Sequence, residues 1–130
     1  MIRGFRYSLL IVEDELTTRR LLTYLLEPYY HVHCAGNGKE AKKWLNAGNK
    51  ADLIITDIEM PIMNGLEFIK LMESKPRYRK IPVMVMSSLS TSSKEFKLIA
   101  DRVKVFLKKP IEPKILFWRI EQLLAEKVTL

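Results

Sequence analysis

Residues 52–69 read DLIITDIEMPIMNGLEFI, and this segment says more about the architecture than any other part of the chain. Leu53 to Thr56 is a continuous apolar run, which is typical of a strand buried on both faces. Pro61 and the pair Asn64-Gly65 then predict a loop. The residues from Leu66 to Glu73 predict a helix. A fully buried strand that leads through a short loop into a helix indicates one unit of a parallel α/β sheet.

The same alternation continues on both sides of this segment. Short apolar runs predict four more strands, and apolar residues at helical spacing predict a helix after each of them. Pro28 and Gly48 end two of these helices, and Pro113 suits the first turn of the last one. The expected strands are 8–12, 31–35, 53–56, 83–86 and 103–107, and the expected helices are 15–27, 37–47, 66–73, 92–100 and 113 to about 127.

Five strand–helix units joined by right-handed crossovers predict a doubly wound α/β fold of the flavodoxin-like type. The sheet would have five parallel strands, with helices on both faces. We expect one (βα)5 domain over residues 1–130, because no linker separates the units and a chain of this length supports one hydrophobic core.

Composition narrows the functional classes. The chain is 48% hydrophobic and 28% charged, which argues against disorder. Its formal net charge is +7, but the basic residues are spread along the chain without interleaved aromatic residues, so we expect solvated helix faces and no direct binding of nucleic acid. The single cysteine, Cys34, excludes an internal disulfide. The first apolar run is short and soon followed by acids, so we expect no signal peptide, no membrane span and a cytoplasmic location.

Chemically reactive residue types follow four of the five predicted strands. Glu13 and Asp14 follow the first, Asp57 the third, Ser87 the fourth and Lys109 the fifth. The carboxyl ends of parallel strands meet at one edge, so we expect these side chains to converge. Three carboxylates repel one another unless a cation is bound or their pKa values rise, and an all-oxygen site suits Mg²⁺. A carboxylate can also attack phosphorus and form an aspartyl phosphate.

Four motifs occur in a characteristic order: VEDE (residues 12–15), the segment 52–69, IPVMVMSS (81–88) and FLKKPI (106–111). Together they resemble the signature of the response regulator receiver family, and the resemblance extends from about Leu9 to about Leu124. The resemblance implies a magnesium site. Asp14 matches the direct carboxylate ligand, Glu13 a neighbour that acts through a metal-bound water, and the backbone carbonyl of Glu59 a further ligand. Asp57 matches the phosphoacceptor and also borders the metal.

The resemblance implies three more roles. Ser87 matches a hydroxyl that bonds the phosphoryl group and moves on activation, and Lys109 a lysine that pairs with the phosphoryl oxygens. Phe106 matches an aromatic residue that changes rotamer with phosphorylation. Phosphotransfer would come from a histidine kinase or a phosphotransfer protein, and the face that contains Phe106 would meet an output protein. Such a chain catalyses only its own phosphorylation and dephosphorylation and is not otherwise an enzyme.

Two other functions are compatible with the residues. One is a receiver-like interaction module that is never phosphorylated, although no reacting residue is missing here. The other, less favoured, is a metal-dependent phosphatase, because a second acid follows Asp57 by two residues; no substrate-binding insertion supports it. The kinase, the pathway, the oligomeric state and whether the chain acts alone or within a larger protein stay open.

Local features add four expectations. The glycine that receivers commonly have after the fourth helix is missing, so Asp101 is expected to adopt the left-handed conformation. The Lys109-Pro110 bond is expected to be cis, as receivers usually hold it. His31, His33 and Cys34 are expected to be ordinary strand residues and not metal ligands. Trp118 lies off the buried stripe of the last helix, and whether it anchors a partner or packs locally stays open.

Overall fold

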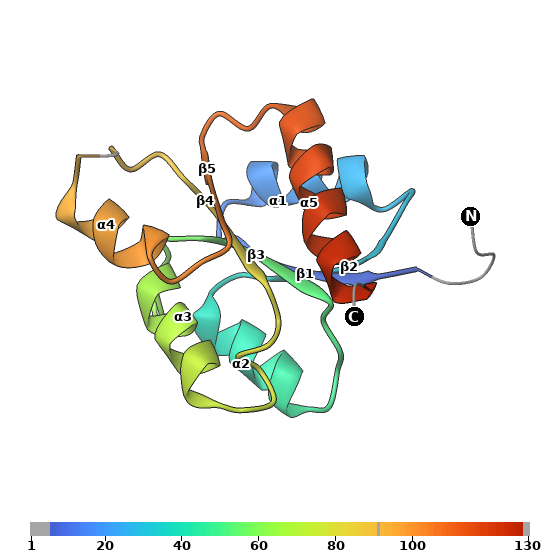
Figure 1. Ribbon diagram of the computed structural model, residues 1–130, viewed down its shortest axis with the longest axis horizontal. Helices are drawn as coiled ribbons and strands as arrows, with labels where there is room; N and C mark the ends of the chain where they lie inside the picture. Colours follow the sequence, from blue (N-terminus) through green and yellow to red (C-terminus); the bar gives the residue numbers. More distant parts are fainter. Residues whose placement is uncertain (1–5, 91, 129–130) are drawn as a thin grey trace.

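The computed structural model describes residues 6–90 and 92–128 and has the predicted architecture (Figure 1). Five strands and five helices alternate along the chain. The sheet order is β2-β1-β3-β4-β5, and every neighbouring pair is parallel. The elements are β1 (Ser8–Val12), α1 (Leu16–Leu26), β2 (His31–Ala35), α2 (Gly38–Asn46), β3 (Leu53–Asp57), α3 (Gly65–Ser74), β4 (Val83–Ser87), α4 (Lys94–Ala100), β5 (Val105–Lys108) and α5 (Pro113–Val128).

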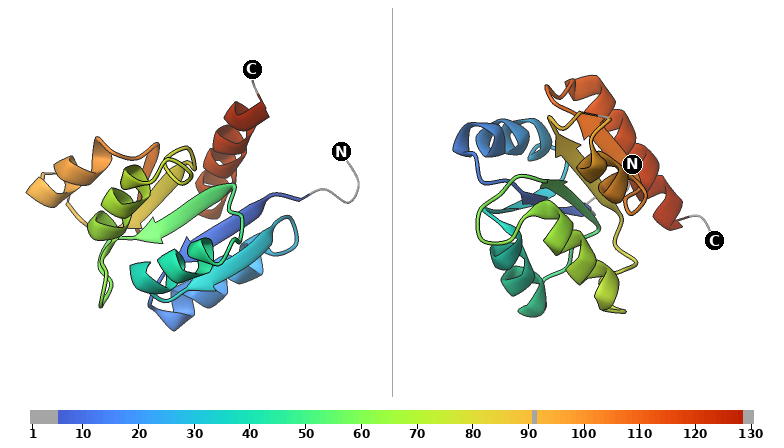
Figure 2. Two further views of the ribbon diagram at one scale, coloured as in Figure 1. Left: turned by 90° about the horizontal axis from the view of Figure 1, so that it is seen from below. Right: turned by 90° about the vertical axis from the view of Figure 1, so that its left-hand side faces the viewer.

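Helices cover both faces of the sheet, as Figures 1 and 2 show. Alternate residues of β1 divide the core in two because successive side chains of a strand point to opposite faces. Leu9 and Ile11 pack with α1 and α5, whereas Leu10 and Val12 pack with α2, α3 and Ile99 of α4. The sheet is therefore the middle of three layers.

The central strands are the most deeply buried elements. All five residues of β3 and all five of β4 are buried, which confirms the prediction from their continuous apolar runs. The edge strand β2 is exposed at His31 and His33. Polar groups at the carboxyl end of a central strand are consequently held at a fixed position by the core below them.

The start of α3 is packed unusually close to the end of β3. A Cβ atom added to Gly65 would lie 2.5 Å from the backbone oxygen of Asp57 and 2.7 Å from the Cα of Ile58. The Gly65 N–H donates a 2.8 Å hydrogen bond to the Ile58 carbonyl. Asn64 precedes it as the N-cap and forms a capping box with Glu67. Glycine is thus required for the helix to begin against the strand.

The sequence-based predictions were wrong at the end of α4. Asp101 is not left-handed; its φ of −73° and ψ of −14° are right-handed, because the chain leaves the helix through a turn closed by the Arg102 N–H on the Ile99 carbonyl. Because of this turn, β5 begins at Val105 and not at residue 103 as predicted. At the other end, α4 begins at Lys94, since the hydroxyl of Ser93 caps the helix by accepting from the Phe96 N–H. The Lys109-Pro110 bond is cis, as expected.

Candidate functional site

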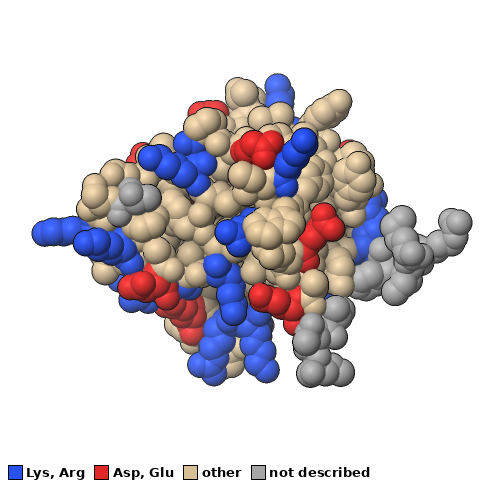
Figure 3. Space-filling view, turned by 45° about the horizontal axis from the view of Figure 1, so that its top comes forward, with Lys and Arg blue, Asp and Glu red and all other residues tan. Residues whose placement is uncertain are grey.

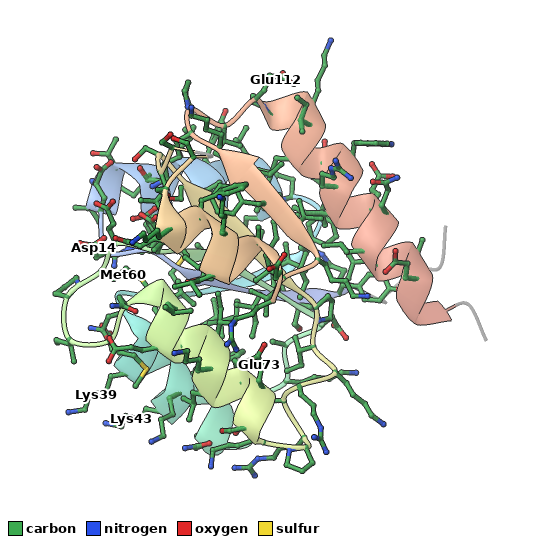
Figure 4. The ribbon with its side chains drawn as sticks, turned by 60° about the vertical axis from the view of Figure 1, so that its left-hand side comes forward. Asp14, Lys39, Lys43, Met60, Glu73 and Glu112 are labelled. Carbon is green, nitrogen blue, oxygen red and sulfur yellow. The ribbon has the colours of Figure 1, made fainter. Side chains whose placement is uncertain are left out.

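Four strand ends bring the predicted polar residues to one edge of the sheet. Glu13 follows β1, Asp57 is the last residue of β3, Ser87 is the last residue of β4, and Lys109 follows β5. Figure 4 labels Asp14 at this edge. Glu13, Asp57 and Ser87 are buried, although all three side chains are polar. Buried polar groups need partners, so their contacts define the site.

Lys109 is the central cation of this site. Its Nζ lies 2.9 Å from Asp57 Oδ2 and 3.1 Å from Glu13 Oε1, and its side chain is only 25% exposed. Its backbone N–H donates to the Ser87 carbonyl at 2.9 Å. One lysine therefore ties together the ends of β1, β3, β4 and β5.

The two buried carboxylates use their other oxygens on the backbone. Asp57 Oδ1 accepts from the Ile58 N–H at 2.7 Å, and Glu13 Oε2 accepts from the Glu15 N–H at 3.1 Å. Each carboxylate thus has one amide partner and one ammonium partner. These contacts fix the orientation of both groups before any ligand is bound.

Burial and charge act on this site in opposite directions. Burial raises the pKa of Glu13, and the Glu15 amide and Lys109 offset only part of this effect. Burial lowers the pKa of Lys109, but its hydrogen bonds and charge interactions with Asp57 and Glu13 outweigh burial, so the pKa is raised. The ammonium therefore stays charged near neutral pH, whereas Glu13 pays a desolvation penalty that a bound cation would relieve.

The same edge holds a candidate cation site. One carboxylate oxygen from each of Glu13, Asp14 and Asp57 can be chosen so that all lie within 4.8 Å of one another. Asp14 is exposed and the other two are buried, so the group opens to solvent on one side. Three carboxylates in this arrangement fit a hard divalent cation that keeps some of its water. Glu59 has an exposed side chain two residues after Asp57, and the role implied for its carbonyl stays a prediction.

Ser87 and Phe106 lie beside the cluster and face neighbouring elements. The hydroxyl of Ser87 accepts from the Leu89 N–H at 3.1 Å, which ties it to the loop before α4. The half-buried Phe106 packs edge-on against Phe96 of α4, with ring centroids 4.6 Å apart. Phe96 was not singled out from the sequence, because nothing local indicates which aromatic residue would face β5.

Two further groups that the sequence analysis discussed, the histidines and cysteine of β2 and Trp118 of α5, have contacts within the chain. The ring of His33 stacks on Trp44 at 4.5 Å, and Cys34 Sγ lies 3.3 Å from the Thr23 hydroxyl. Within the described residues, the acidic cluster is the only group of three or more potential ligands whose ligand atoms lie close together, and that His31 and His33 are not ligands stays a prediction. Trp118 is 54% exposed, with the Arg119 guanidinium 4.8 Å from its ring centre.

Known proteins share this arrangement of sequence and fold. The family described as "Response regulator receiver domain" matches residues 9–121. A chemotaxis protein of Helicobacter pylori is 31% identical, covering 91% of this chain and 97% of that protein. The crystal structure of the receiver domain of a signal transduction histidine kinase from Syntrophus aciditrophicus has a TM-score of 0.87 and 31% identity, with 95% of each chain covered.

Other relatives are much longer than the matched region. A 3′,5′-cyclic-nucleotide phosphodiesterase of Dictyostelium discoideum is 32% identical over 125 residues, which are 92% of this chain but 15% of that protein. Its match is confined to one part of a larger polypeptide. Separately, among the residues that the structure describes, no helix has the length and apolar character needed to cross a bilayer.

Proposed function

The chain belongs to the response regulator receiver domain family of two-component signalling, and from this premise we propose that it accepts a phosphoryl group on Asp57 from a histidine kinase or a phosphotransfer protein. The observation that carries the proposal is the double contact of Lys109 with Asp57 and Glu13. This contact places the Lys109 ammonium beside the buried carboxylate of Asp57, and the exposed Asp14 belongs to the same cluster. We further propose that residues 1–130 act as one domain.

The chemistry assigned to Asp57 is nucleophilic attack on phosphorus. A bond forms between a carboxylate oxygen of Asp57 and phosphorus, and the bond from phosphorus to the donor's nitrogen breaks, with the electron pair leaving on the donor. Lys109 would move with its ammonium onto a phosphoryl oxygen and neutralise part of its charge. Asp57 Oδ1 is held by the Ile58 N–H, which keeps the carboxylate oriented during this exchange.

We propose Glu13, Asp14 and Asp57, with the carbonyl of Glu59, as the residues that would hold Mg²⁺. Their convergence within 4.8 Å and the burial of Glu13 support this assignment. When bound, the ion would neutralise negative charge on the phosphoryl oxygens.

The proposed output runs through Ser87 and Phe106. If the Ser87 hydroxyl turns to donate to a phosphoryl oxygen, it gives up its bond from the Leu89 N–H and frees the loop before α4. A new rotamer of Phe106 would break its edge contact with Phe96. Both changes alter the surface formed by α4 and β5, where we propose that an output protein binds.

Intact-mass analysis after treatment with acetyl phosphate tests the function. We expect one added phosphoryl group that depends on Mg²⁺, none in Asp57→Asn, and full modification in Asp101→Asn, whose exposed acid lies at the other end of the sheet. Modification of Asp57→Asn to the parent's extent would refute the assignment. Repeated turnover of p-nitrophenyl phosphate would instead identify a phosphatase.

A further inference from the structure

A second candidate site lies at the amino ends of β4 and β5, at the opposite end of these strands from the acidic cluster. It is a pocket of about 350 Å³ between the end of α3, the segment 78–83 and the turn 101–104. Val83, at the amino end of β4, lines it, whereas Ser87, at the carboxyl end of the same strand, lies at the acceptor edge. Four residue steps of a strand separate them by about 13 Å, so this pocket is distinct from the acidic site.

The pocket has an apolar floor and a basic rim. The half-buried Ile81, Pro82 and Val103 form the accessible floor, and Ile69, Met72 and Val83, which also line the pocket, are buried. Lys and Arg side chains line the pocket. On the face drawn in Figure 3, basic side chains gather toward the lower edge of the molecule, with acidic side chains beside them. The cations that line the pocket are Arg79, Lys80, Arg102 and Lys104, and the acids are Glu73 and Asp101.

Among the described residues, only one of the four cations is paired with an acid in an ion pair. Arg102 is bonded to Glu73, labelled in Figure 4, at 2.5 Å. In the described ranges, Arg79, Lys80 and Lys104 form no ion pair within 4.0 Å. Three cations therefore face the pocket without a partner carboxylate. The four cations and two acids that line the pocket leave it with a formal charge of +2, so an anionic ligand would be attracted to it.

The cations come from two backbone segments that are already fixed. Tyr78 is 5% exposed, and its hydroxyl donates to Asn46 Oδ1 at 2.6 Å. The Arg79 N–H bonds to the Lys75 carbonyl at 3.0 Å, and the Lys104 N–H bonds to the Val83 carbonyl at 3.2 Å. The backbone of the rim therefore needs little ordering on binding, and the entropic cost falls on the long side chains.

We propose that this pocket binds an acidic peptide segment of a partner protein, with an apolar side chain on the floor and carboxylates against Arg79, Lys80 and Lys104. An inorganic anion would leave the apolar floor uncovered. Nucleic acid would need cations along an extended surface, whereas here they surround one small cavity. Because the pocket is at the far edge of the sheet, the proposal does not depend on phosphorylation of Asp57.

Fluorescence anisotropy with a labelled peptide of sequence EEDLDEE tests the proposal on the full chain. The parent should bind it saturably, and more weakly as salt is added. The double variant Arg79→Glu with Lys104→Glu should lose affinity by about tenfold or more, since both reversals replace attraction with repulsion. Both side chains are exposed, and unchanged circular dichroism would verify the fold. Replacing the peptide's leucine with serine should also weaken binding.

A matched control removes the effect of overall charge. The double variant Lys39→Glu with Lys43→Glu changes the net charge of the chain by the same amount, but on α2, where both side chains point into solvent (Figure 4). It should change the affinity by less than about twofold. Equal losses in the two double variants, no saturable binding by the parent, or stronger competition by a DNA duplex would each overturn the proposal. Asp57→Asn should bind the peptide like the parent, whether or not Asp57 is the acceptor.

Discussion

Replacing Gly65 with alanine should weaken the fold and the acceptor site together. The added Cβ would lie 2.5 Å from the Asp57 oxygen and 2.7 Å from the Ile58 Cα. Ordinary contacts of these kinds are about 3.3 Å and 3.5 Å or more, so about 0.8 Å of extra separation is needed. Both neighbours are backbone atoms of the central strand region and cannot rotate away. The start of α3 and the end of β3 must therefore move apart, which displaces Asp57 as well.

The expected loss is about 1–3 kcal/mol in the free energy of unfolding. Overpacking costs about 1–3 kcal/mol, and the strained hydrogen bond from the Gly65 N–H to the Ile58 carbonyl adds about 1 kcal/mol. The better helix propensity of alanine returns at most about 1 kcal/mol. Urea unfolding should show a midpoint lower by about 1 M. A displacement of Asp57 approaching 1 Å should also slow phosphorylation by acetyl phosphate by up to about 100-fold.

Gly36→Ala is the matched control. Its added Cβ would meet the carboxylate end of Glu40, at 2.7 Å, and that side chain can rotate. We expect a stability change within about 0.5 kcal/mol and an unchanged rate. If Gly65→Ala unfolded at the parent's urea concentration and reacted at the parent's rate, close packing of α3 on β3 would not be what positions the acceptor.

Three further perturbations follow from the site and the loop beside it. Mg²⁺ in excess should raise the thermal midpoint of the parent, and Asp14→Asn should remove most of that shift; an equal shift in both proteins would argue against the cation site. Lys109→Met should cost about 2 kcal/mol at neutral pH in urea unfolding, because two buried carboxylates lose their ammonium, whereas the exposed Lys108→Met should cost almost nothing. The difference should shrink as pH falls and Glu13 is protonated. Ile62 has a φ of 68° and is 75% exposed, so Ile62→Asn should raise stability by about 1 kcal/mol, and Ile62→Val should not, since a β-branched residue keeps the strain.

The layout of the sheet and the acidic edge could be predicted because both depend on short-range patterns. A strand buried on both faces must be apolar throughout, as in Leu53 to Thr56 and Val83 to Met86. The residue types that follow such strands are then brought together by topology alone. The predicted convergence of Glu13, Asp14 and Asp57 is found for this reason.

Features that depend on how distant segments meet could not be predicted. The turn at Asp101 is right-handed because a backbone hydrogen bond to Ile99 was available, and the sequence does not reveal which of two helix endings is used. The edge contact of Phe96 with Phe106 depends on the rotation of α4 over the sheet. The basic pocket needs the segments 78–83 and 101–104, whose nearest residues are 18 positions apart in the sequence, to meet beside the end of α3.

The cluster tied together by Lys109 has a simple consequence for ion valence. When ionised, Glu13, Asp14 and Asp57 bring three negative charges and Lys109 brings one positive charge, a sum of −2. A divalent ion would balance that sum, whereas a sodium ion would leave an excess of −1 and a lanthanide an excess of +1. A phosphoryl group carries about −1.5 to −2, but the bond to phosphorus removes the −1 of the Asp57 carboxylate. The net addition is therefore about −0.5 to −1, which makes the edge anionic again. The divalent ion and the phosphoryl group have opposite charges, so each favours the presence of the other at this edge. Phosphorylation should therefore tighten the binding of the divalent ion by the same factor by which the ion favours phosphorylation.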